Sequence, residues 1–372
     1  MNRIPTVAHF RGEFGRISQT FIYDLIVGIP GQRAVLVYGE HMDPDGEFPL
    51  PPYSIRTAIS FKEPETSVEP LVEVLKERGV SLVHAHFGYD LPLAALVADQ
   101  LGVPLVATFH GADASSFANR YKWQAIYRTL LPRVDAMVII DPGKTDRLIE
   151  FGAKPERIHH IPLGIDLDFW EPAKRNASTT AMRILSVGRL VEKKGHDLLI
   201  HAVGRAVREG LDMRLVIAGD GEEERLLQEL IRAYDLEERV TLAGLVDRQQ
   251  VRKLMTETDI FALASHTTES GDEEGSPVVL TEAMAMGLPV LSTVHADIPS
   301  VVNHGVTGIL VTEGSIDDLS LGLRKIAEMR DRWKDMGRAG RRWVRQHRNR
   351  ETVLERWRAL YDHVLNARMV AI

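Results

Sequence analysis

The chain has 372 residues, a formal net charge of −7, 44% hydrophobic and 26% charged residues, and no cysteine. This length suits two domains better than one, and the lack of cysteine excludes disulfides, thiolate nucleophiles and cysteine-ligated metal sites. The negative charge disfavours a general nucleic-acid binder, and no apolar run approaches the roughly 20 residues of a membrane helix.

Short apolar runs alternate with amphipathic stretches through the first half of the chain. Strands separated by helices predict βαβ units, which build a parallel sheet with right-handed crossovers. The expected strands are Thr6–Phe10, Ala34–Tyr38, Leu82–Ala85, Leu105–Phe109 and Ala136–Ile140. The expected helices are Gln19–Val27, Val68–Arg78, Leu91–Leu101, Lys122–Leu131 and Gly143–Phe151.

The alternation pauses after Pro162, and the polar, aperiodic run Trp170–Thr180 is the best linker candidate. A second series then predicts strands at Ile184–Val187, Arg214–Ala218, Val240–Ala243, Ile260–Ala264, Val290–Ser292 and Gly308–Val311. Its expected helices are Asp197–Arg208, Glu223–Tyr234, Gln249–Thr256, Val278–Met286, Ile316–Met329, Trp333–His347 and Thr352–Asn366. We therefore predict an α/β fold of two doubly wound, Rossmann-like domains, 1–170 and 171–350, with ligands bound at strand ends in one interdomain cleft.

The most specific motif runs from Glu274 to Glu282. Ser276 is a good helix N-cap and Pro277 suits the first helical position, so a helix start that attracts phosphate is expected there. One carboxylate can bind a sugar's hydroxyls while the other holds a ribose diol, each hydrogen bond contributing about 1.5–3 kcal/mol. The alternative interpretation is a helix with solvated acids.

A second motif, Val187–Gly195, follows a predicted strand and opens a helix. Gly188 permits close backbone approach to a ligand, and Arg189 and Lys194 can meet a diphosphate. The segment lacks G-x-x-x-x-G-K-[ST] and G-x-G-x-x-G, which excludes Walker-type and dinucleotide sites. Surface salt bridges are the competing interpretation.

Two further strand ends could wall a nucleotide base through backbone contacts. They are Ile217–Gly221, which contains Gly219 and Gly221, and Ala243–Asp247, which contains Leu245. Glycine after a strand is more often only a turn, so each signal is weak alone.

In the first half, strand ends place His84, His86, His110 and Asp113 near the expected cleft. A metal site is disfavoured, because catalytic zinc usually takes histidine pairs at fixed helical spacing with a clear third ligand. His84 and His86 share one face of a strand, so one of them is expected to be a core histidine and His110 is the better functional candidate.

The loop Phe14–Phe21 joins the first strand to the first helix, and Ser18 can cap that helix. Its functional interpretation is acceptor binding, and a plain capped loop is the equal alternative. The candidate acceptor residues are Ser18, Gln19, Thr20, His86 and Asp113.

Taken together, these motifs resemble the retaining glycosyltransferase family 4, which has the GT-B fold. The resemblance covers nearly the whole chain and is strongest over 188–311, where E-x7-E, G-R-L…K-K-G, A-G-D-G and E-A-M-A-x-G-L-P-V occur in the family's order. The segments Ser18–Ile22, Glu269–Gly275 and Ser292–Pro299 resemble the bacterial exopolysaccharide, colanic-acid-type branch. The departures are Gln19 for the usual Glu, Ser300 where Glu commonly follows Ile-Pro, and the unusual loop Phe10–Arg16, all of which bear on acceptor or donor-sugar identity.

The resemblance implies a role for each motif residue. Arg189 and Lys194 would bind the donor diphosphate, Glu274 the transferred sugar and Glu282 the ribose, while His110 would lie near the reacting carbon. The implied donor-binding set is Gly188, Gly219, Gly221, Leu245, Gly275, Ser276, Pro277, Val278 and Glu282. It also implies front-face attack with the departing phosphate as base, no cofactor and no metal, and a final helix, 351–372, that crosses back onto the first domain.

The expected activity is therefore transfer of a sugar from a nucleotide-diphosphate sugar, UDP-linked rather than GDP-linked, to a saccharide or lipid-linked saccharide acceptor. The expected location is cytoplasmic and peripheral at the inner face of the membrane, without a nucleic-acid partner. The basic stretch Arg338–Arg350 could contact anionic lipid, or could be a solvated helix face. The alternatives are a nucleotide-sugar epimerase and a catalytically silent sugar-nucleotide-binding or scaffold protein.

Overall fold

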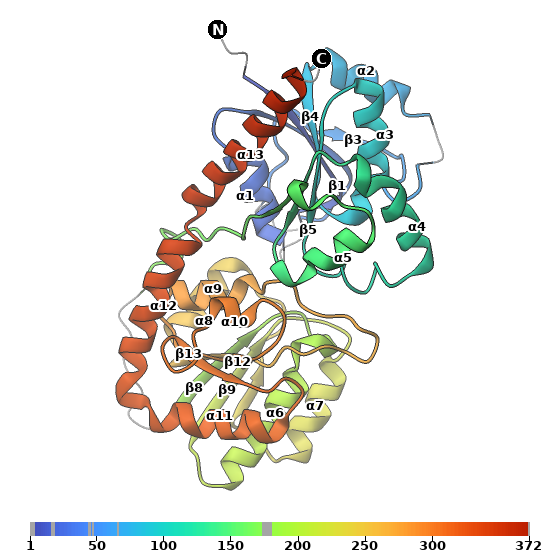
Figure 1. Ribbon diagram of the computed structural model, residues 1–372. Helices are drawn as coiled ribbons and strands as arrows, with labels where there is room; N and C mark the ends of the chain where they lie inside the picture. The colour runs from blue at the N-terminus through green and yellow to red at the C-terminus, as the bar shows by residue number, and fades with distance from the viewer. Residues whose placement is uncertain are drawn as a thin grey trace. The chain divides into compact units, whose positions relative to one another are not determined.

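The computed structural model describes residues 4–15, 19–43, 46, 48–64, 67–172 and 181–370 of the chain (Figure 1). The chain divides into two compact units. The first unit holds residues 1–164 and 351–372, and the second unit holds residues 165–350. The division falls at 164/165, before the predicted boundary at 170/171.

The first unit is built on a parallel sheet with strand order β3-β2-β1-β4-β5-β6-β7. The direction in which successive strands are added to the sheet reverses between β1 and β4, where His9 lies opposite His84. Ligands of open α/β sheets bind at such a reversal. The short strands β3 and β7 were not predicted, because two or three residues carry no periodic signal. The strands are β1 (Thr6–Phe14), β2 (Arg33–His41), β3 (Ile55–Arg56), β4 (Val80–Ala85), β5 (Leu105–Phe109), β6 (Ala136–Ile139) and β7 (Ile158–His160).

Helices cover both faces of this sheet. On one face α2, α3 and α4 pack against alternate strand residues such as Ala8, and on the other α1 and α13 pack against residues such as Val7. Figure 1 shows α13 beside α1, and Trp357 and Leu360 of α13 form a core with Leu25 of α1. The helices are α1 (Thr20–Gly28), α2 (Glu69–Glu77), α3 (Leu91–Leu101), α4 (Tyr121–Leu130), α5 (Thr145–Glu150) and α13 (Arg350–Val370).

The second unit repeats the plan with a parallel sheet of order β10-β9-β8-β11-β12-β13, whose reversal lies between β8 and β11. Two parallel sheets with crossover helices confirm the predicted α/β architecture. The strands are β8 (Met182–Val187), β9 (Met213–Ala218), β10 (Val240–Leu242), β11 (Ile260–Leu263), β12 (Val290–Thr293) and β13 (Gly308–Val311).

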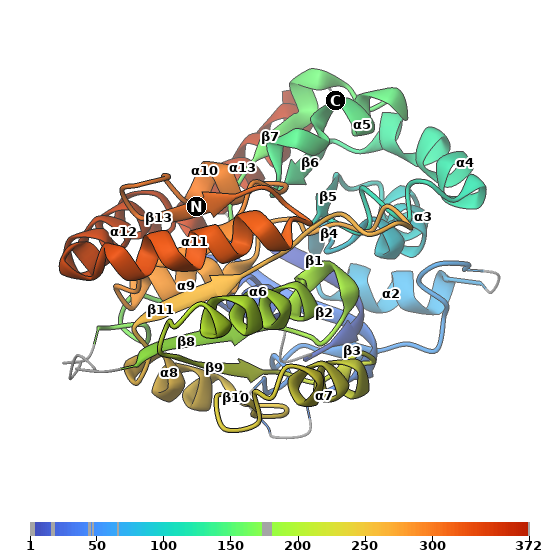
Figure 2. The ribbon, with the colours of Figure 1, turned by 90° about the horizontal axis from the view of Figure 1, so that it is seen from below.

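Two layers of helices bury this second sheet. The core on one face comes from α6, α7 and α11, and the core on the other from α8, α9, α10 and α12. Figure 2 shows α6 running alongside the strands of this sheet, and α6 contacts β9 and β11. The helices are α6 (His196–Arg208), α7 (Glu224–Ala233), α8 (Arg248–Thr256), α9 (Val278–Ala285), α10 (Ile298–Val301), α11 (Ile316–Glu328) and α12 (Trp333–His347).

The start of the predicted linker is wrong, because Trp170 is 1% exposed and packs with Ile165 in the second unit's core. The backbone amide of Ile165 donates to the Arg348 carbonyl at 2.6 Å, and that of Arg350 donates to the Ile165 carbonyl at 3.0 Å. The remainder of the predicted linker, 173–180, lies outside the described residues.

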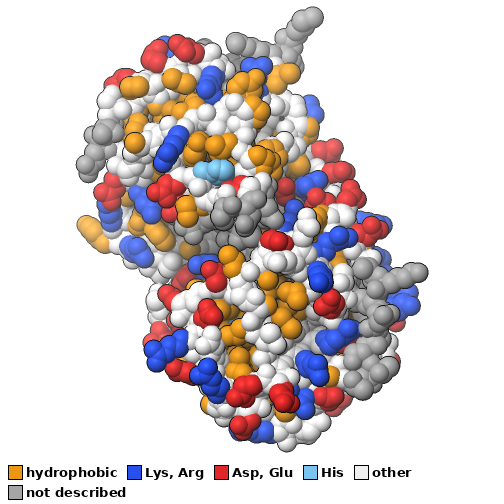
Figure 3. All heavy atoms as spheres, turned by 180° about the vertical axis from the view of Figure 1, so that it is seen from behind, with side chains coloured by type: hydrophobic (Ala, Val, Ile, Leu, Met, Phe, Trp, Pro, Cys, Tyr) orange, Lys and Arg blue, Asp and Glu red, His pale blue; other side chains and the backbone are white. Residues whose placement is uncertain are grey.

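Part of the basic stretch 338–350 has a structural role. Arg341 Nη1 donates to the carbonyls of Trp170 and Ala285 at 2.9 and 2.6 Å, and Arg350 pairs with Asp166 at 2.8 Å. On the face drawn in Figure 3, basic and acidic side chains are interspersed rather than gathered by sign. Among the described residues, no helix has both the length and the apolar character needed to cross a bilayer.

Candidate functional site

The carboxyl end of β8, at the reversal of the second sheet, carries the predicted phosphate loop. After Val187 the chain passes Gly188 and an exposed Arg189, makes a short 3-10 turn, and enters α6 through Gly195 in the left-handed conformation. A Cβ on Gly195 would lie 2.1 Å from the Ala264 carbonyl oxygen, beyond the end of β11. Glycine there therefore lets the loop after β8 pack against the neighbouring strand end.

Lys194 and Glu274 meet at this edge, as the predicted site requires. Lys194 Nζ lies 2.9 Å from Glu274 Oε1, with side chains only 13% and 10% exposed. Burial alone would raise the pKa of Glu274, but Lys194 and Lys193 outweigh burial and hold that pKa below its ordinary value. Glu274 is therefore an ionised, nearly buried carboxylate beside a cation at neutral pH.

The loop that carries Glu274 is held from two sides by residues that sequence reasoning missed. From one side the buried Lys193 Nζ donates to Asp272 Oδ1 at 3.1 Å and to the Glu273 carbonyl at 3.3 Å. From the other, His295 Nε2 accepts the Glu274 backbone N–H at 3.1 Å. The two adjacent lysines of the K-K-G segment could have pointed to Lys193. No local sequence pattern could have pointed to His295.

Helix α9 begins at Val278, as the predicted range Val278–Met286 has it, but Pro277 is not its first helical residue. Pro277 occupies the N-cap with an extended ψ of 106°, the first helical residue is Val278, and no side chain caps the helix. The prediction that Ser276 caps this helix is therefore wrong, because the extended Pro277 leaves Ser276 one residue outside the cap. Gly275 is buried and Glu282 lies partly buried on α9, and their donor-binding roles stay predictions.

The glycines of the A-G-D-G segment have a packing role. Gly219 and Gly221 have φ of +144° and +155°, and a Cβ on either would lie 1.9 Å from the Gly188 oxygen or 2.3 Å from the Leu190 oxygen. They allow the loop after β9 to press against the loop after β8. Leu245, beyond β10, is 59% exposed, and its contact with a base stays a prediction.

In the first unit, the reversal point carries a buried ionic cluster centred on Arg11, a residue that the sequence analysis did not single out. Arg11 Nη1 lies 3.3 Å from Asp90 Oδ2, and its Nη2 donates to Gln19 Oε1 at 3.0 Å. Burial raises the pKa of Asp90 to about 6, against the opposing effect of Arg11. Gln19 stands at the N-cap of α1 and Thr20 is its first residue, while Ser18 lies outside the described residues.

Asp113 and His110 lie at the carboxyl end of β5. Asp113 is fully buried and accepts the backbone N–H groups of Gly88, His110 and Gly111 at 2.9–3.0 Å. These bonds give it a loop-holding role, and direct acceptor contact stays a prediction. The His110 ring lies 4.9 Å from that of Phe21, and burial, with Arg11, lowers its pKa to about 3.

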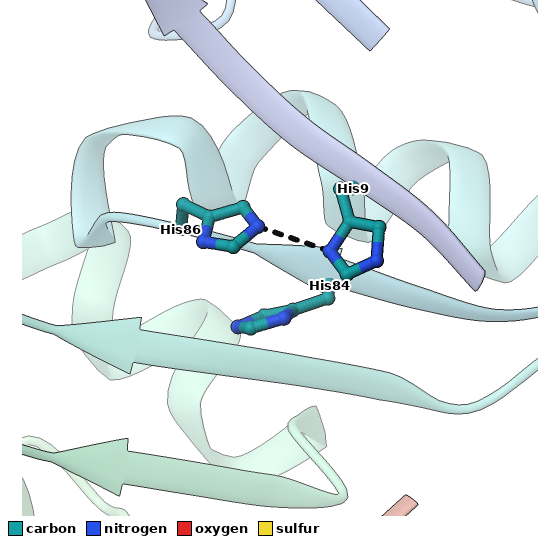
Figure 4. A group of neighbouring side chains, drawn as sticks. All are labelled: His9, His84 and His86. Carbon is teal, nitrogen blue, oxygen red and sulfur yellow. Dashed lines mark hydrogen bonds between the residues drawn. The ribbon is translucent and has the colours of Figure 1, made fainter. Parts of the chain in front are cut away.

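His9 of β1 joins His84 of β4 and His86, which directly follows β4, in a buried cluster (Figure 4). His9 Nδ1 lies 3.0 Å from His86 Nε2, whereas both nitrogens of His84 are 2.7 Å from hydroxyl oxygens, those of Tyr361 and Thr108. A metal ion here would have to displace one hydroxyl from His84. His84 is therefore a core histidine, as the shared strand face predicted for one of the pair, and direct contact of His86 with an acceptor stays a prediction.

Family models for glycosyltransferases match both halves of the chain. A family model described as Glycosyltransferase Family 4 matches residues 23–169, and one described as Glycosyl transferases group 1 matches residues 169–343. A GDP-mannose-dependent monoacylated alpha-(1-6)-phosphatidylinositol monomannoside mannosyltransferase of Corynebacterium glutamicum is 30% identical over 306 residues, covering 78% of each chain.

A second relative is WcaL of Escherichia coli (strain K12), whose name assigns it to colanic acid biosynthesis as a glycosyltransferase. It is 36% identical over 248 residues, 66% of this chain, and the match spans 61% of that relative's length. The crystal structure of Anabaena HepE with UDP and glucose superposes with a TM-score of 0.78 over 96% of this chain and 100% of that one. At 18% identity this likeness concerns the fold alone, and it confirms the predicted GT-B fold with its two Rossmann-like domains.

Proposed function

Because this chain belongs to the glycosyltransferases, with a family 4 region followed by a group 1 region, we propose that it moves a sugar from a nucleotide-diphosphate sugar to a saccharide or lipid-linked saccharide. The transfer retains anomeric configuration and serves exopolysaccharide or cell-surface glycan synthesis. The colanic acid assignment of its relative WcaL supports this pathway class.

The Lys194–Glu274 pair carries this proposal. It places a cation and an ionised carboxylate 2.9 Å apart at the edge of the second sheet where order reverses. A donor diphosphate attracts Lys194 and the exposed Arg189 of the same loop. Glu274 is then released to accept hydrogen bonds from the hydroxyls of the sugar that is transferred.

In this proposal the same residues let the donor bond break without a metal ion. The leaving diphosphate gains charge in the transition state, and cations already in place stabilise that charge more than they stabilise the bound substrate. Amides after Glu274, at the start of α9, add donors to the same region. We assign a UDP-linked donor, which the UDP and glucose bound to the structural neighbour HepE support.

We assign acceptor recognition to the first unit, at the end of its sheet where Arg11, Gln19 and Asp90 form the buried cluster. Asp113 and His110 lie at the end of β5 on the same sheet. A lipid-linked acceptor implies peripheral contact with the inner face of the membrane, which co-flotation with anionic liposomes at low and high salt tests.

Thermal-shift measurements with UDP-, GDP- and ADP-sugars test the donor assignment first. A donor that binds only the folded protein adds about 2.7 kcal/mol at 100 times its Kd, a readily measured shift. Release of nucleoside diphosphate that requires an added saccharide then identifies a transferase. Release of an epimerised sugar without acceptor identifies an epimerase instead, and a shift without any release identifies a silent binding protein.

A further inference from the structure

Three neighbouring strands of the second sheet are tied together just beyond their carboxyl ends by one carboxylate. Glu313, which follows β13, places Oε2 2.5 Å from Nδ1 of His295, which follows β12. The same oxygen accepts the backbone N–H of Thr267, which follows β11, at 3.0 Å. The Glu313 carboxylate thus fixes the ring of His295 relative to two adjacent strand ends.

The hydrogen bonds of His295 define its tautomer. The backbone N–H of Glu274 can only donate, so Nε2, which lies 3.1 Å from it, must present its lone pair. An ionised carboxylate can only accept, so Nδ1 carries the proton that is donated to Glu313. The side chain of His295 is 1% exposed, and water therefore cannot readily replace either partner.

We propose that His295, in the neutral Nδ1–H form, is a positioning residue for sugar transfer that acts through the backbone of Glu274. This inference rests on the proposed function, because Glu274 is taken to bind the transferred sugar. Lys193 holds Asp272 and Glu273 on one side of the loop, and His295 holds the Glu274 amide. Between them they aim the Glu274 carboxylate at Lys194.

Two substitutions separate this role from a general need for histidine. In His295→Gln, the side-chain carbonyl reaches the position of Nε2 and can still accept the Glu274 amide. In His295→Asn, the shorter side chain reaches only the position of Nδ1, so it can donate to Glu313 but leaves the Glu274 amide without its acceptor. The two variants are otherwise matched in charge and polarity.

The first experiment measures UDP binding, donor binding and turnover on the full-length parent, both variants and His304→Gln, an exposed-histidine control. UDP-glucose, UDP-galactose and GDP-mannose are the donor probes. We expect His295→Asn to lower kcat/KM about 10- to 100-fold, by analogy with the loss seen when the hydrogen-bonding partner of a metal ligand is removed. We expect His295→Gln to retain most of the parent's kcat/KM. UDP binding should be unchanged in both variants, because UDP lacks the sugar that Glu274 binds.

Equal activity of His295→Asn and the parent, or equal losses in the Asn and Gln variants, would overturn the inference while leaving the proposed function in place. A parent that neither binds nor turns over any donor would overturn the proposed function instead.

The second experiment does not depend on activity. Imidazole ¹⁵N spectra of histidine-labelled protein report which ring nitrogen carries the proton, and His295→Gln assigns the signal by its loss. We expect a protonated Nδ1 and an unprotonated Nε2 at neutral pH. Protonation at Nε2 alone, or at both nitrogens, would contradict the inference whether or not the protein is a transferase.

Discussion

Lys194 and Glu274 come from loops 80 positions apart in the sequence, and Lys194 Nζ lies 2.9 Å from Glu274 Oε1 at the edge of the second sheet. The pair joins the loop after β8 to the loop before α9, so two separate sequence motifs become one site. Its members are nearly buried, which makes their mutual attraction stronger than that of a surface pair.

Removal of either cation should mainly slow catalysis. Lys194→Ala and Arg189→Ala should each lower kcat by about 10²–10³-fold, the loss that follows when one donor to a developing oxyanion is removed. Arg189→Lys should restore activity only in part, because an ammonium lacks the bidentate geometry of guanidinium. Arg225→Ala, which removes a cation from a side chain that is 90% exposed, is the control. Parent-rate turnover by both folded variants would show that the site is assigned wrongly.

Glu282 should affect binding more than chemistry. It is assigned to the ribose, which does not react, so Glu282→Ala should raise the KM for the donor while kcat changes little. Steady-state kinetics over a range of donor concentrations give both values. Glu229→Ala, on the exposed face of α7, controls for the loss of one negative charge. A fall in kcat with an unchanged KM would place Glu282 at the reacting bond instead.

Turnover should survive chelation. Lys194, Arg189 and the amides at the start of α9 supply the positive potential that a divalent ion supplies in other sites. The turnover rate measured after dialysis against excess EDTA should equal that of the untreated enzyme. Activity that disappears with EDTA and returns with Mg²⁺ or Mn²⁺ would contradict the metal-free mechanism.

The buried histidines should make the protein less stable in acid. Burial lowers the pKa of His9 to about 3, so between about pH 6.5 and 3 the unfolded chain binds a proton that the folded protein does not. The free energy of unfolding should therefore decrease as the pH is lowered through this window. The decrease is at most about 1.4 kcal/mol per pH unit for each such histidine. Urea unfolding at several pH values measures the slope.

His9→Gln should flatten that slope, whereas substitution of the exposed His304 by Gln should leave it unchanged. An unaltered slope in His9→Gln would mean that His9 is protonated equally in both states.

Gly219 should tolerate no side chain. Its φ of +144° is unfavourable for other residues, and a Cβ would lie 1.9 Å from the Gly188 carbonyl oxygen. Gly210→Ala is the matched control, since Gly210 also has a positive φ but has nothing within 4 Å of a Cβ. The control should lose about 1–2 kcal/mol of stability from backbone strain alone, and Gly219→Ala clearly more. Equal losses in thermal or urea unfolding would show that the loop can move aside.

Periodicity and motif chemistry were enough to predict most of the architecture. The ends of β5, β13, α3 and α12 lie at the predicted residues, because alternating burial in strands and helical spacing of apolar residues are written locally in the chain. The grouping of Lys194 with Glu274 could also be predicted, since parallel strands bring their carboxyl ends to one edge.

Only the tertiary structure decided which residues support the site. The supporting residues form hydrogen bonds with partners far away in the sequence: 79 positions for Arg11, 21 for His295 and 18 for Glu313. No local sequence pattern indicates such pairs. Trp170 was assigned to a linker because its sequence neighbours are polar, but it packs with Ile165 in the second unit's hydrophobic core. Sequence thus determined the elements and the charged strand ends, whereas long-range hydrogen bonds and packing, which depend on how the sheets bring distant segments together, determined what holds those charges in place.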